Sequence, residues 1–368
     1  MTDAEKQVSR LIGEPVERIV IVRALYLGDL LLAVPAFRAI RSGFPSAEIT
    51  LIGLSWAAVF VERFSAYIDR FLPFPGYPGI AEVAVDPART ETFLHEQRDY
   101  GYDLVIQMHG SGVTSNPFAL DLGGRTTAAY FVGDRLSGLT HAAPYPDDQS
   151  EVKRNLGLAR LLGCDTRDDR LEFPLRAADH AEARLLLGSV DRERPLVGLH
   201  PGAKFLSRRW MPERFAAVAD ALADRFGARI VITGGPDEVD VVERVAGSMR
   251  HEPLVLAGRT SIGGLAAVIA EFDLFISNDT GPSHIATALD VPSIAIFGPA
   301  DVRRWASPDT TNHRIVRNPV PCSPCGYEIC PIDHRCLTGI EPEQVLHVAE
   351  ELLVRHAPNK RHRKAVAC

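Results

Sequence analysis

A polar turn near residue 280 interrupts the apolar residues around it. The apolar run 274–276 leads into the segment 278–284, Asn-Asp-Thr-Gly-Pro-Ser-His, and apolar residues then recur at helical spacing. This pattern predicts a strand, a tight turn and a helix, whose first turn has unpaired N–H groups and a partial positive charge. Gly281 lets a ligand approach the backbone, so the turn is a candidate phosphate or diphosphate site. The alternative is that Asp279 or Thr280 only caps the helix.

Four further turns that contain glycine follow apolar runs. They are Gly28-Asp29 and His109-Gly110 in the first half of the chain, and His200-Pro201-Gly202 and Gly234-Gly235-Pro236 in the second half. Ligands of open α/β sheets bind beyond the carboxyl ends of the strands, where these turns are expected to lie. None of the turns has the glycine spacing of a dinucleotide-binding fold or of a P-loop. The sequence therefore disfavours dinucleotide oxidoreductases and NTPases.

Predicted strands and helices alternate along the chain, and the alternation restarts once. Apolar runs at 18–23, 49–52 and 103–107 are separated by helical patterns, and a similar series begins at 196–200. The segment 175–195 between the two series is rich in charge and alanine. Strands that alternate with helices predict an open parallel sheet with both faces covered. We therefore expect an α/β protein with two Rossmann-like, doubly wound domains.

The expected domains account for most of the chain. Residues 1–180 form the first domain and residues 190–340 the second, in which the nucleotide would bind. A helix at 341–356 has apolar residues at helical spacing and is expected to pack back toward the first domain. Residues 357–368 form a basic tail. Its alternatives are a solvated end and a contact with an anionic membrane surface.

The composition is that of a soluble globular protein. The chain has 368 residues, 46% of them hydrophobic and 24% charged, which is enough for two domains with buried cores. Its net charge of −7 argues against a nucleic-acid partner. No apolar run is long enough to span a membrane, and residues 1–10 lack the apolar core of a signal peptide. We therefore expect a cytoplasmic protein, with peripheral contact at the inner face of the plasma membrane as an option.

Four cysteines lie close together near the C-terminus. They are Cys322, Cys325, Cys330 and Cys336, and the first two form a C-x2-C pair. Four thiolates can coordinate zinc or iron tetrahedrally in a structural site. The alternative is four reduced structural cysteines, because the spacing is not that of a standard zinc finger. Two disulfides would need an oxidising compartment.

In their order and spacing these turns resemble the pattern of glycosyltransferase family 9, the ADP-heptose:lipopolysaccharide heptosyltransferases and their relatives. The resemblance extends from Arg18 to about Leu353. Besides the turns above, it includes Pro35, Arg208-Arg209-Trp210 and Phe297-Gly298-Pro299. It implies a GT-B fold with two Rossmann-like domains facing a cleft. It also implies transfer of a sugar from a nucleotide-sugar donor with inversion, and without a catalytic metal or other cofactor.

The resemblance implies roles for individual residues. Asp29 matches the aspartate that takes the proton of the attacking hydroxyl; the alternative is a helix N-cap. The turn Asp279-Thr280-Gly281 would receive the leaving diphosphate through its N–H groups and the Thr280 hydroxyl. Arg208 stands where the family has a lysine that contacts the donor phosphates. A guanidinium can bind a diphosphate bidentately, but its reach is different.

Four further residues have two interpretations each. Asp237 matches an acidic residue that bonds the ribose hydroxyls and Glu238 is the neighbouring candidate, although either is also a common first-turn helix acid. His284 is either a donor to phosphate or a packed, hydrogen-bonded histidine. His109 would face the acceptor, and its alternative is a satisfied loop histidine.

The implied function is transfer of a heptose from ADP-heptose to a hydroxyl of an acceptor such as lipopolysaccharide core. A saccharide, a lipid-linked molecule, a protein or a small molecule would each offer such a hydroxyl. A nucleotide-sugar 2-epimerase of the GT-B kind is a second enzyme class to consider. A two-lobed periplasmic sugar-binding protein is a third interpretation, but it would need an export signal. Release of free nucleotide in the presence of acceptor distinguishes the transferase from the others.

Overall fold

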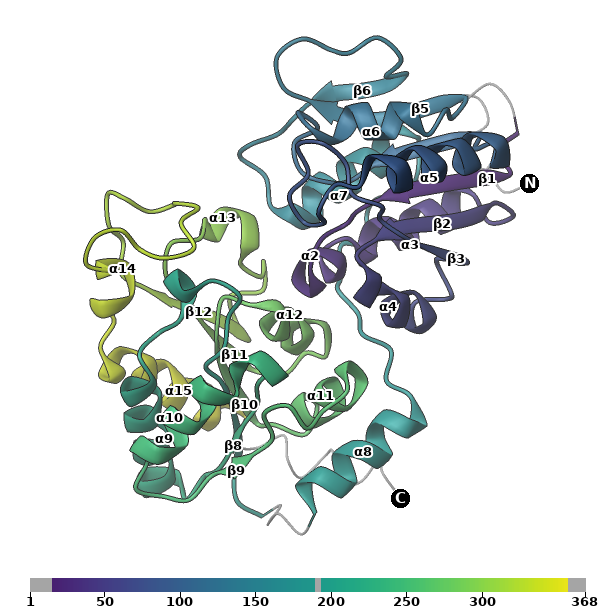
Figure 1. Ribbon diagram of the computed structural model, residues 1–368. Helices are drawn as coiled ribbons and strands as arrows, with labels where there is room; N and C mark the ends of the chain where they lie inside the picture. The colour runs from purple at the N-terminus through teal and green to yellow at the C-terminus, as the bar shows by residue number, and fades with distance from the viewer. Residues whose placement is uncertain (1–14, 189–192, 357–368) are drawn as a thin grey trace. The chain divides into compact units, whose positions relative to one another are not determined.

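The computed structural model describes residues 15–188 and 193–356, and the chain divides into two compact units, Met1–Pro174 and Leu175–Cys368 (Figure 1). The boundary falls before helix α8 (Ala177–Leu187), because α8 packs against α11 (Ile262–Ile269) of the second unit. No helix in these described ranges is long and apolar enough to cross a membrane. The predicted basic tail, residues 357–368, lies outside the described residues.

The first unit is built on a sheet of six parallel strands. In spatial order the strands are β3 (Arg70–Pro73), β2 (Glu48–Gly53), β1 (Arg18–Val22), β4 (Leu104–Gln107), β5 (Thr126–Phe131) and β6 (His141–Pro144). Four of the five residues of β1 are completely buried, as expected for a central strand covered on both faces. This burial is why the strand appears as a continuous apolar run in the sequence.

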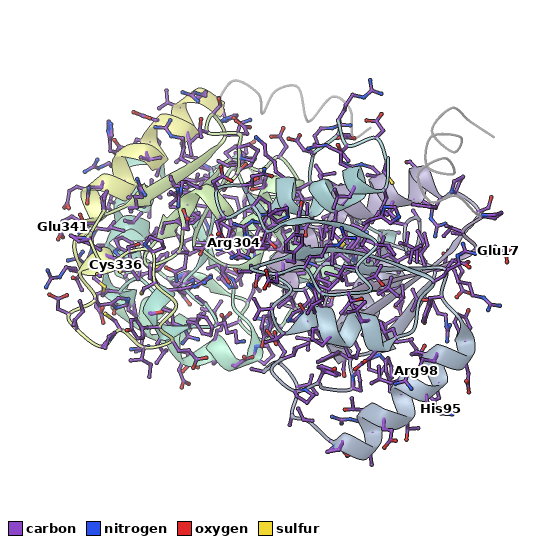
Figure 2. The ribbon with its side chains drawn as sticks, turned by 90° about the horizontal axis from the view of Figure 1, so that it is seen from above. Glu17, His95, Arg98, Arg304, Cys336 and Glu341 are labelled. Atoms are coloured by element: carbon purple, nitrogen blue, oxygen red, sulfur yellow. The ribbon has the colours of Figure 1, made fainter. Side chains whose placement is uncertain are left out.

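Helices with recognisable start signals connect these strands. They are α2 (Leu27–Leu31), α3 (Val34–Gly43), α4 (Ala58–Arg63) after a 3-10 turn (Ser55–Ala57), α5 (Pro87–Tyr100), α6 (Ser115–Asp121) and α7 (Glu151–Leu161). Asp86 caps α5 by accepting two backbone N–H groups, and Ser150 caps α7 in the same way with one. On α5, Leu94 is buried, whereas His95 and Arg98 are exposed (Figure 2).

The second unit repeats the same sheet topology. Its strands lie in the order β12 (His313–Arg317), β11 (Ser293–Phe297), β10 (Leu274–Asn278), β7 (Leu196–His200), β8 (Arg229–Ile232) and β9 (Leu254–Val255), all parallel. In both units the order corresponds to 3-2-1-4-5-6 of the doubly wound nucleotide-binding fold. The order reverses between β1 and β4 in the first unit and between β7 and β10 in the second.

The helices of the second unit include the last helix of the described residues. They are α8, α9 (Pro212–Phe226), α10 (Val239–Ser248), α11, α12 (Gly281–Ala288), α13 (Val302–Trp305), α14 (Arg335–Thr338) and α15 (Pro342–His356), with 3-10 turns η2 (Leu206–Arg208) and η3 (Pro236–Glu238). The helix expected to pack toward the first domain is α15. Within its own unit, α15 packs against α9 and the sheet, because its apolar face, which includes Val345 and Leu352, joins that core.

Two glycines of the second unit provide a matched test of how tightly the core around β7 is packed. Gly198 lies in the central strand β7, where an added Cβ would come 2.1 Å from the ring of Phe272. We expect Gly198→Ala to lower the free energy of unfolding by about 1–3 kcal/mol, because the core must shift to accommodate it. Gly247 of α10 has open space around it, so Gly247→Ala should be neutral or stabilising by up to about 1 kcal/mol. Urea unfolding of the two variants measures both, and equal effects would contradict the packing described for β7.

Candidate functional site

The predicted turns lie at the carboxyl ends of the central strands in both sheets. In the first unit, Asp29 follows β1 and His109 follows β4. In the second unit, His200 ends β7 and Asp279 follows β10. These are the strand pairs at which the strand order reverses, the position where doubly wound folds bind their ligands. Each unit therefore presents candidate residues at the expected edge of its sheet.

Asp29 lies in the first turn of α2 and is half-buried. The helix begins at Leu27, so Asp29 is its third residue, not the N-cap that the alternative prediction required. Its Oδ2 accepts the N–H of Tyr26 at 3.2 Å, so the carboxylate does stabilise the helix start. Asp29 therefore combines a local structural contact with a position at the ligand-binding edge.

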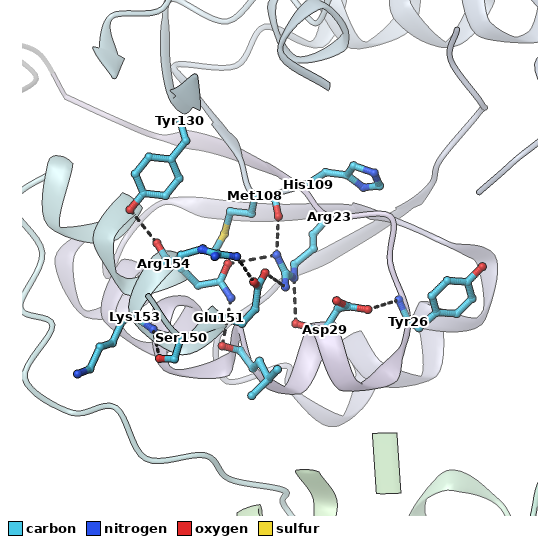
Figure 3. A network of polar contacts seen from close by, with 12 residues as sticks. Arg23, Tyr26, Asp29, Met108, His109, Tyr130, Ser150, Glu151, Lys153 and Arg154 are labelled. Carbon is cyan, nitrogen blue, oxygen red and sulfur yellow. Dashed lines mark hydrogen bonds and ion pairs between the residues drawn. The ribbon is translucent and has the colours of Figure 1, made fainter. Parts of the chain in front are cut away.

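A buried arginine connects Asp29 with the rest of the first unit (Figure 3). The Arg23 side chain is 1% exposed, and its Nε donates to the backbone oxygen of Asp29 at 3.0 Å. One terminal nitrogen donates to the carbonyl of Met108 at 2.5 Å and to Oδ1 of Asn155 at 3.1 Å. The other pairs with Glu151 at 3.1 Å. The backbones on which Asp29 and His109 lie are thereby fixed to each other and to α7.

A second arginine satisfies the other oxygen of Glu151. Arg154 lies 3.2 Å from Glu151 Oε2 and also donates to the Tyr145 hydroxyl at 2.8 Å. A buried carboxylate needs such partners, because an unpaired charge in the interior is costly. The sequence reasoning missed Arg23, Glu151 and Arg154. The only available signal was the charged residue at the end of the apolar run 18–23.

His109 is buried, and its ring is only partly satisfied. Its Nε2 lies 3.7 Å from Glu82 Oε2, whereas Nδ1 has no hydrogen-bond partner among the described residues. Burial lowers the pKa of His109 to about 4; Glu82 opposes this shift and Arg23 adds to it. The imidazole is therefore neutral at physiological pH. This environment differs from that of a fully hydrogen-bonded loop histidine.

In the second unit, Glu238 is tied to the fold by two partners. Its Oε2 accepts the Gly235 N–H at 2.7 Å and lies 3.3 Å from Nε2 of His200, whose Nδ1 contacts the Thr233 hydroxyl at 3.0 Å. Burial by itself would raise the pKa of Glu238, but the contact with His200 and the Gly235 N–H outweigh it and lower the pKa to about 2. Asp237, the adjacent candidate, is exposed in the turn η3. The two acids therefore have different surroundings.

Arg208 and Asp279 meet at the end of β10. Arg208 Nη1 donates to Asp279 Oδ2 at 3.3 Å, and the Asp279 side chain is 4% exposed, whereas that of Arg208 is 29% exposed. Thr280 is the N-cap of α12 and has an extended backbone. Within the described residues no hydrogen bond is made to the N–H groups of Thr280 or Gly281. A guanidinium and two backbone donors thus lie at one helix start.

The buried amide of Asn278 brings these segments together. Its Oδ1 accepts the N–H of Trp210 at 3.0 Å, and its Nδ2 donates to the carbonyls of Pro201 at 2.7 Å and Gly202 at 3.3 Å. An added Cβ at Gly202 would come 2.1 Å from the Glu238 carboxylate, so this turn also lies against η3. The structure therefore brings Arg208, Glu238 and the turn after β10 to the same sheet edge.

His284 lies near the start of α12 and is 7% exposed. It lines a small pocket with Trp305 and His313, between α12 and the strands β11 and β12. Burial lowers the pKa of His284 to about 4. These surroundings favour the alternative prediction, that His284 is a packed histidine.

The four predicted cysteine ligands line one small pocket. Cys322, Cys325, Cys330 and Cys336 share it with His334, and all four are free thiols. Burial raises the pKa of Cys336, and the three neighbouring thiols add to the shift. In the part of the chain that the structure describes, no three of the sulfur atoms lie within 4.8 Å of one another. The cysteines are gathered but not arranged as a closed tetrahedral site.

Comparison with known proteins identifies a family and several relatives. A family model for glycosyltransferase family 9 (heptosyltransferase) matches residues 92–335. The lipooligosaccharide heptosyltransferase 2 of Campylobacter jejuni subsp. jejuni is 31% identical over 333 residues, which are 89% of this chain and 96% of that protein. The lipopolysaccharide heptosyltransferase 2 of Salmonella typhimurium is 25% identical, over 91% of this chain and 98% of that protein.

Solved structures share the fold. A glycosyl transferase family 9 protein from Veillonella parvula has a TM-score of 0.76 at 23% identity and covers 92% of this chain and 98% of its own. The ADP-heptose LPS heptosyltransferase II of E. coli has a TM-score of 0.73 at 19% identity, with 92% and 99% covered. The iron-containing dodecameric glycosyltransferase TibC of enterotoxigenic E. coli has a TM-score of 0.56 at 14% identity, with 92% and 76% covered. The predicted α/β architecture of the GT-B kind is confirmed.

Two of the buried histidines, His109 and His284, make a prediction about pH. Both His109 and His284 have a pKa lowered to about 4, below the ordinary value of 6.5. Between these values the unfolded chain binds protons that the folded protein does not, so stability should fall as the pH is lowered from about 6.5 toward 4. Urea unfolding at several pH values measures this loss of folding free energy. The loss between pH 6.5 and 4 should be smaller in His284→Gln than in wild type. NMR titration gives a direct check, and a ring resonance of either histidine that titrates near pH 6.5 would contradict the burial described here.

Proposed function

This chain belongs to glycosyltransferase family 9, and we propose that it transfers a heptose from ADP-heptose to a hydroxyl of a lipopolysaccharide core. Its relatives over almost their whole length are named as heptosyltransferases, and one similar structure is named for ADP-heptose. The observation that carries the proposal is a group of hydrogen-bond donors in the second unit, which we call the anion site. There Arg208 and the N–H groups of Thr280 and Gly281 gather at a helix start.

The anion site would bind the donor diphosphate and stabilise it as it leaves. A guanidinium has five N–H groups in a planar fork, and the hydrogen bond to Asp279 uses one nitrogen of Arg208, Nη1. Other N–H groups of the fork can therefore contact phosphate oxygens, together with the backbone donors of Thr280 and Gly281. Negative charge grows on the diphosphate as the bond to the sugar breaks, so preorganised donors stabilise the transition state more than the ground state.

Between the two acids of η3, we assign contact with the ribose to Asp237. Glu238 is engaged by His200 and the Gly235 N–H, and its low pKa of about 2 reflects these contacts. Asp237 is exposed, so its carboxylate can accept hydrogen bonds from the ribose hydroxyls. Glu238 would then support the turn that presents Asp237.

Asp29 would act as the general base on the acceptor side. Its carboxylate takes the proton of the acceptor hydroxyl while that oxygen forms a bond to the anomeric carbon of the heptose. The bond from this carbon to the diphosphate oxygen breaks on the opposite face, which inverts the configuration and releases ADP. We place neutral His109 nearby as a hydrogen-bonding partner for the acceptor, because its Nδ1 has no partner among the described residues.

The acceptor and the donor each have alternatives. A protein or small-molecule hydroxyl would use the same chemistry, and a lipid-linked saccharide would bring the enzyme into peripheral contact with the inner face of the plasma membrane. An assay of free ADP from ADP-heptose separates these hypotheses. Release only with a lipopolysaccharide core acceptor supports the proposal, and release only with another acceptor changes the substrate. A new nucleotide sugar without acceptor would indicate an epimerase.

Asp29→Asn tests the base in this assay. We expect a fall in kcat of about 10²–10⁴, because an amide cannot take the proton. ADP affinity measured by calorimetry should stay unchanged, since the donor site belongs to the second unit. The amide oxygen of the substituted side chain can still accept the Tyr26 N–H, so the helix start is preserved. Asp86→Asn changes a helix cap of α5 in the same unit and should retain turnover. A kcat within tenfold of wild type for Asp29→Asn would refute the assignment.

We further propose that the four cysteines bind a structural zinc or iron ion. Four thiols in one pocket are a suitable donor set, and the similar TibC structure is described as iron-containing. The thiolates of Cys322, Cys325, Cys330 and Cys336 would hold the ion, so every ligand would come from the one loop that carries them. The ion would cross-link this loop, and no step of the sugar transfer depends on it.

The metal content of the purified protein tests this second proposal. Elemental analysis should find about one zinc or iron per chain, and Cys325→Ser or Cys330→Ser should lower it, because each variant removes a ligand. Cys164→Ala is the matched control, since Cys164 is buried in the first unit and should not change the metal content. Four reactive thiols and no metal in the wild-type protein would leave the cysteines as reduced structural residues and refute the ion.

A further inference from the structure

Ser207 is tied to the segment that carries the four cysteines, residues 322–336, which we call the cysteine loop. The Ser207 N–H donates to the carbonyl of Glu328 at 2.9 Å, and its hydroxyl donates to the carbonyl of Tyr327 at 2.5 Å. Its own carbonyl lies 2.6 Å from Nε2 of His334, which donates to it. All three polar groups of this one residue therefore bond to the cysteine loop.

Ser207 directly precedes Arg208 in the turn η2. The turn is short, and two local bonds close it, from the N–H of Arg208 to Phe205 at 3.0 Å and from that of Arg209 to Leu206 at 3.1 Å. Ser207 is 2% exposed, so its bonds are shielded from water. Buried bonds of this kind define a position because leaving any one of them unmade is costly. The orientation of η2, and with it the start of the Arg208 side chain, depends on the cysteine loop.

The backbone of His334 is consistent with a specific role in this contact. It has φ 58° and ψ 27°, the left-handed region, which is unusual for a residue other than glycine. Glycine would adopt this conformation without penalty. A histidine in this position brings an imidazole that reaches Ser207, a contact that glycine could not make. His334 thus adopts an unfavourable backbone conformation and at the same time makes a hydrogen bond to η2.

The other side of the cysteine loop is attached to the end of β11. The Cys325 N–H donates to the carbonyl of Pro299 at 2.9 Å, and the Ser323 hydroxyl donates to that of Gly298 at 3.4 Å. The loop therefore spans from the end of a core strand to the turn η2. Through these contacts the position of η2, and of Arg208 in it, is fixed relative to the edge of the sheet.

We propose that the cysteine loop is a positioning element of the donor site, in which Ser207 and His334 hold Arg208 toward the diphosphate of a nucleotide-sugar donor. The proposal rests on the function proposed above, in which Arg208 binds that diphosphate. The affinity for a nucleoside diphosphate should therefore depend on the cysteine loop, and ADP is the probe. In this proposal Ser207 and His334 act on the donor through Arg208, because their polar groups are engaged with each other and with the cysteine loop.

Binding of ADP to the full-length protein, measured by calorimetry, tests this positioning role. His334→Gly and Ser207→Ala should each weaken ADP binding about tenfold, because each removes a bond that orients η2. The melting temperature of His334→Gly should stay close to that of wild type, because relief of the left-handed backbone offsets the loss of one buried hydrogen bond. A purely structural role for His334 would instead lower the melting temperature and leave the affinity of the folded protein unchanged. Such a split between stability and affinity identifies positioning.

A double-mutant cycle and a control complete the test. With Arg208→Ala as background, His334→Gly should have no further effect on ADP affinity, because the coupling runs through Arg208. Glu328→Gln is the control, since Glu328 contacts Ser207 through its backbone carbonyl and its side chain is exposed. If wild type binds ADP and both loop variants bind within twofold of it, this inference fails and the donor site remains. If wild type binds no nucleoside diphosphate, the proposed function fails, and this inference fails with it.

Discussion

The amide of Asn278 is the contact on which the candidate donor site depends. It is completely buried at the end of β10, and it bonds to the turn after β7 and to the N–H of Trp210. Breaking such a bond in the interior costs about 1–3 kcal/mol, so these segments are restricted to one arrangement. Trp210 is itself buried and donates its ring N–H to Ile340 at 3.1 Å. Arg208 therefore lies between two anchors, Trp210 on one side and Ser207 on the other.

In the first unit, a buried charged side chain, Arg23, holds the segments of the candidate site in place. Arg23 is buried at the end of β1, and burying a guanidinium is favourable only when its donors are satisfied. It bonds to the backbone oxygen of Asp29 and pairs its charge with Glu151. The carboxylate of Asp29 is thus positioned through its backbone, and its hydrogen bond from the Tyr26 N–H adds a second, local contact.

The sequence predicts those features of the structure that are determined by residues close together in the chain. Apolar runs, glycine turns and helix spacing are local signals, and they located the central strands β1, β4, β7 and β10 and the turns at their ends. The contacts that arrange the site are long-range: Arg23 and Glu151 are 128 residues apart, and Ser207 and His334 are 127 apart. No periodic pattern encodes such a pairing. For the same reason the apolar face of α15 was visible in the sequence, while the surface that it covers was not.

The arginine at position 208 also explains the placement of Asp279. Asp279 is buried and its carboxylate needs a cation, which Arg208 supplies through one nitrogen while its guanidinium lies over the ring of Phe205. The family pattern predicts a lysine here. The ammonium group of a lysine is a compact charge, so a single group would have to contact both Asp279 and a phosphate. The planar fork of arginine can contact both at once, since its N–H groups point in different directions. The departure from lysine is therefore compatible with a diphosphate site, provided that η2 holds the fork in the correct orientation. That requirement is what makes the bonds of Ser207 to the cysteine loop consequential for the donor.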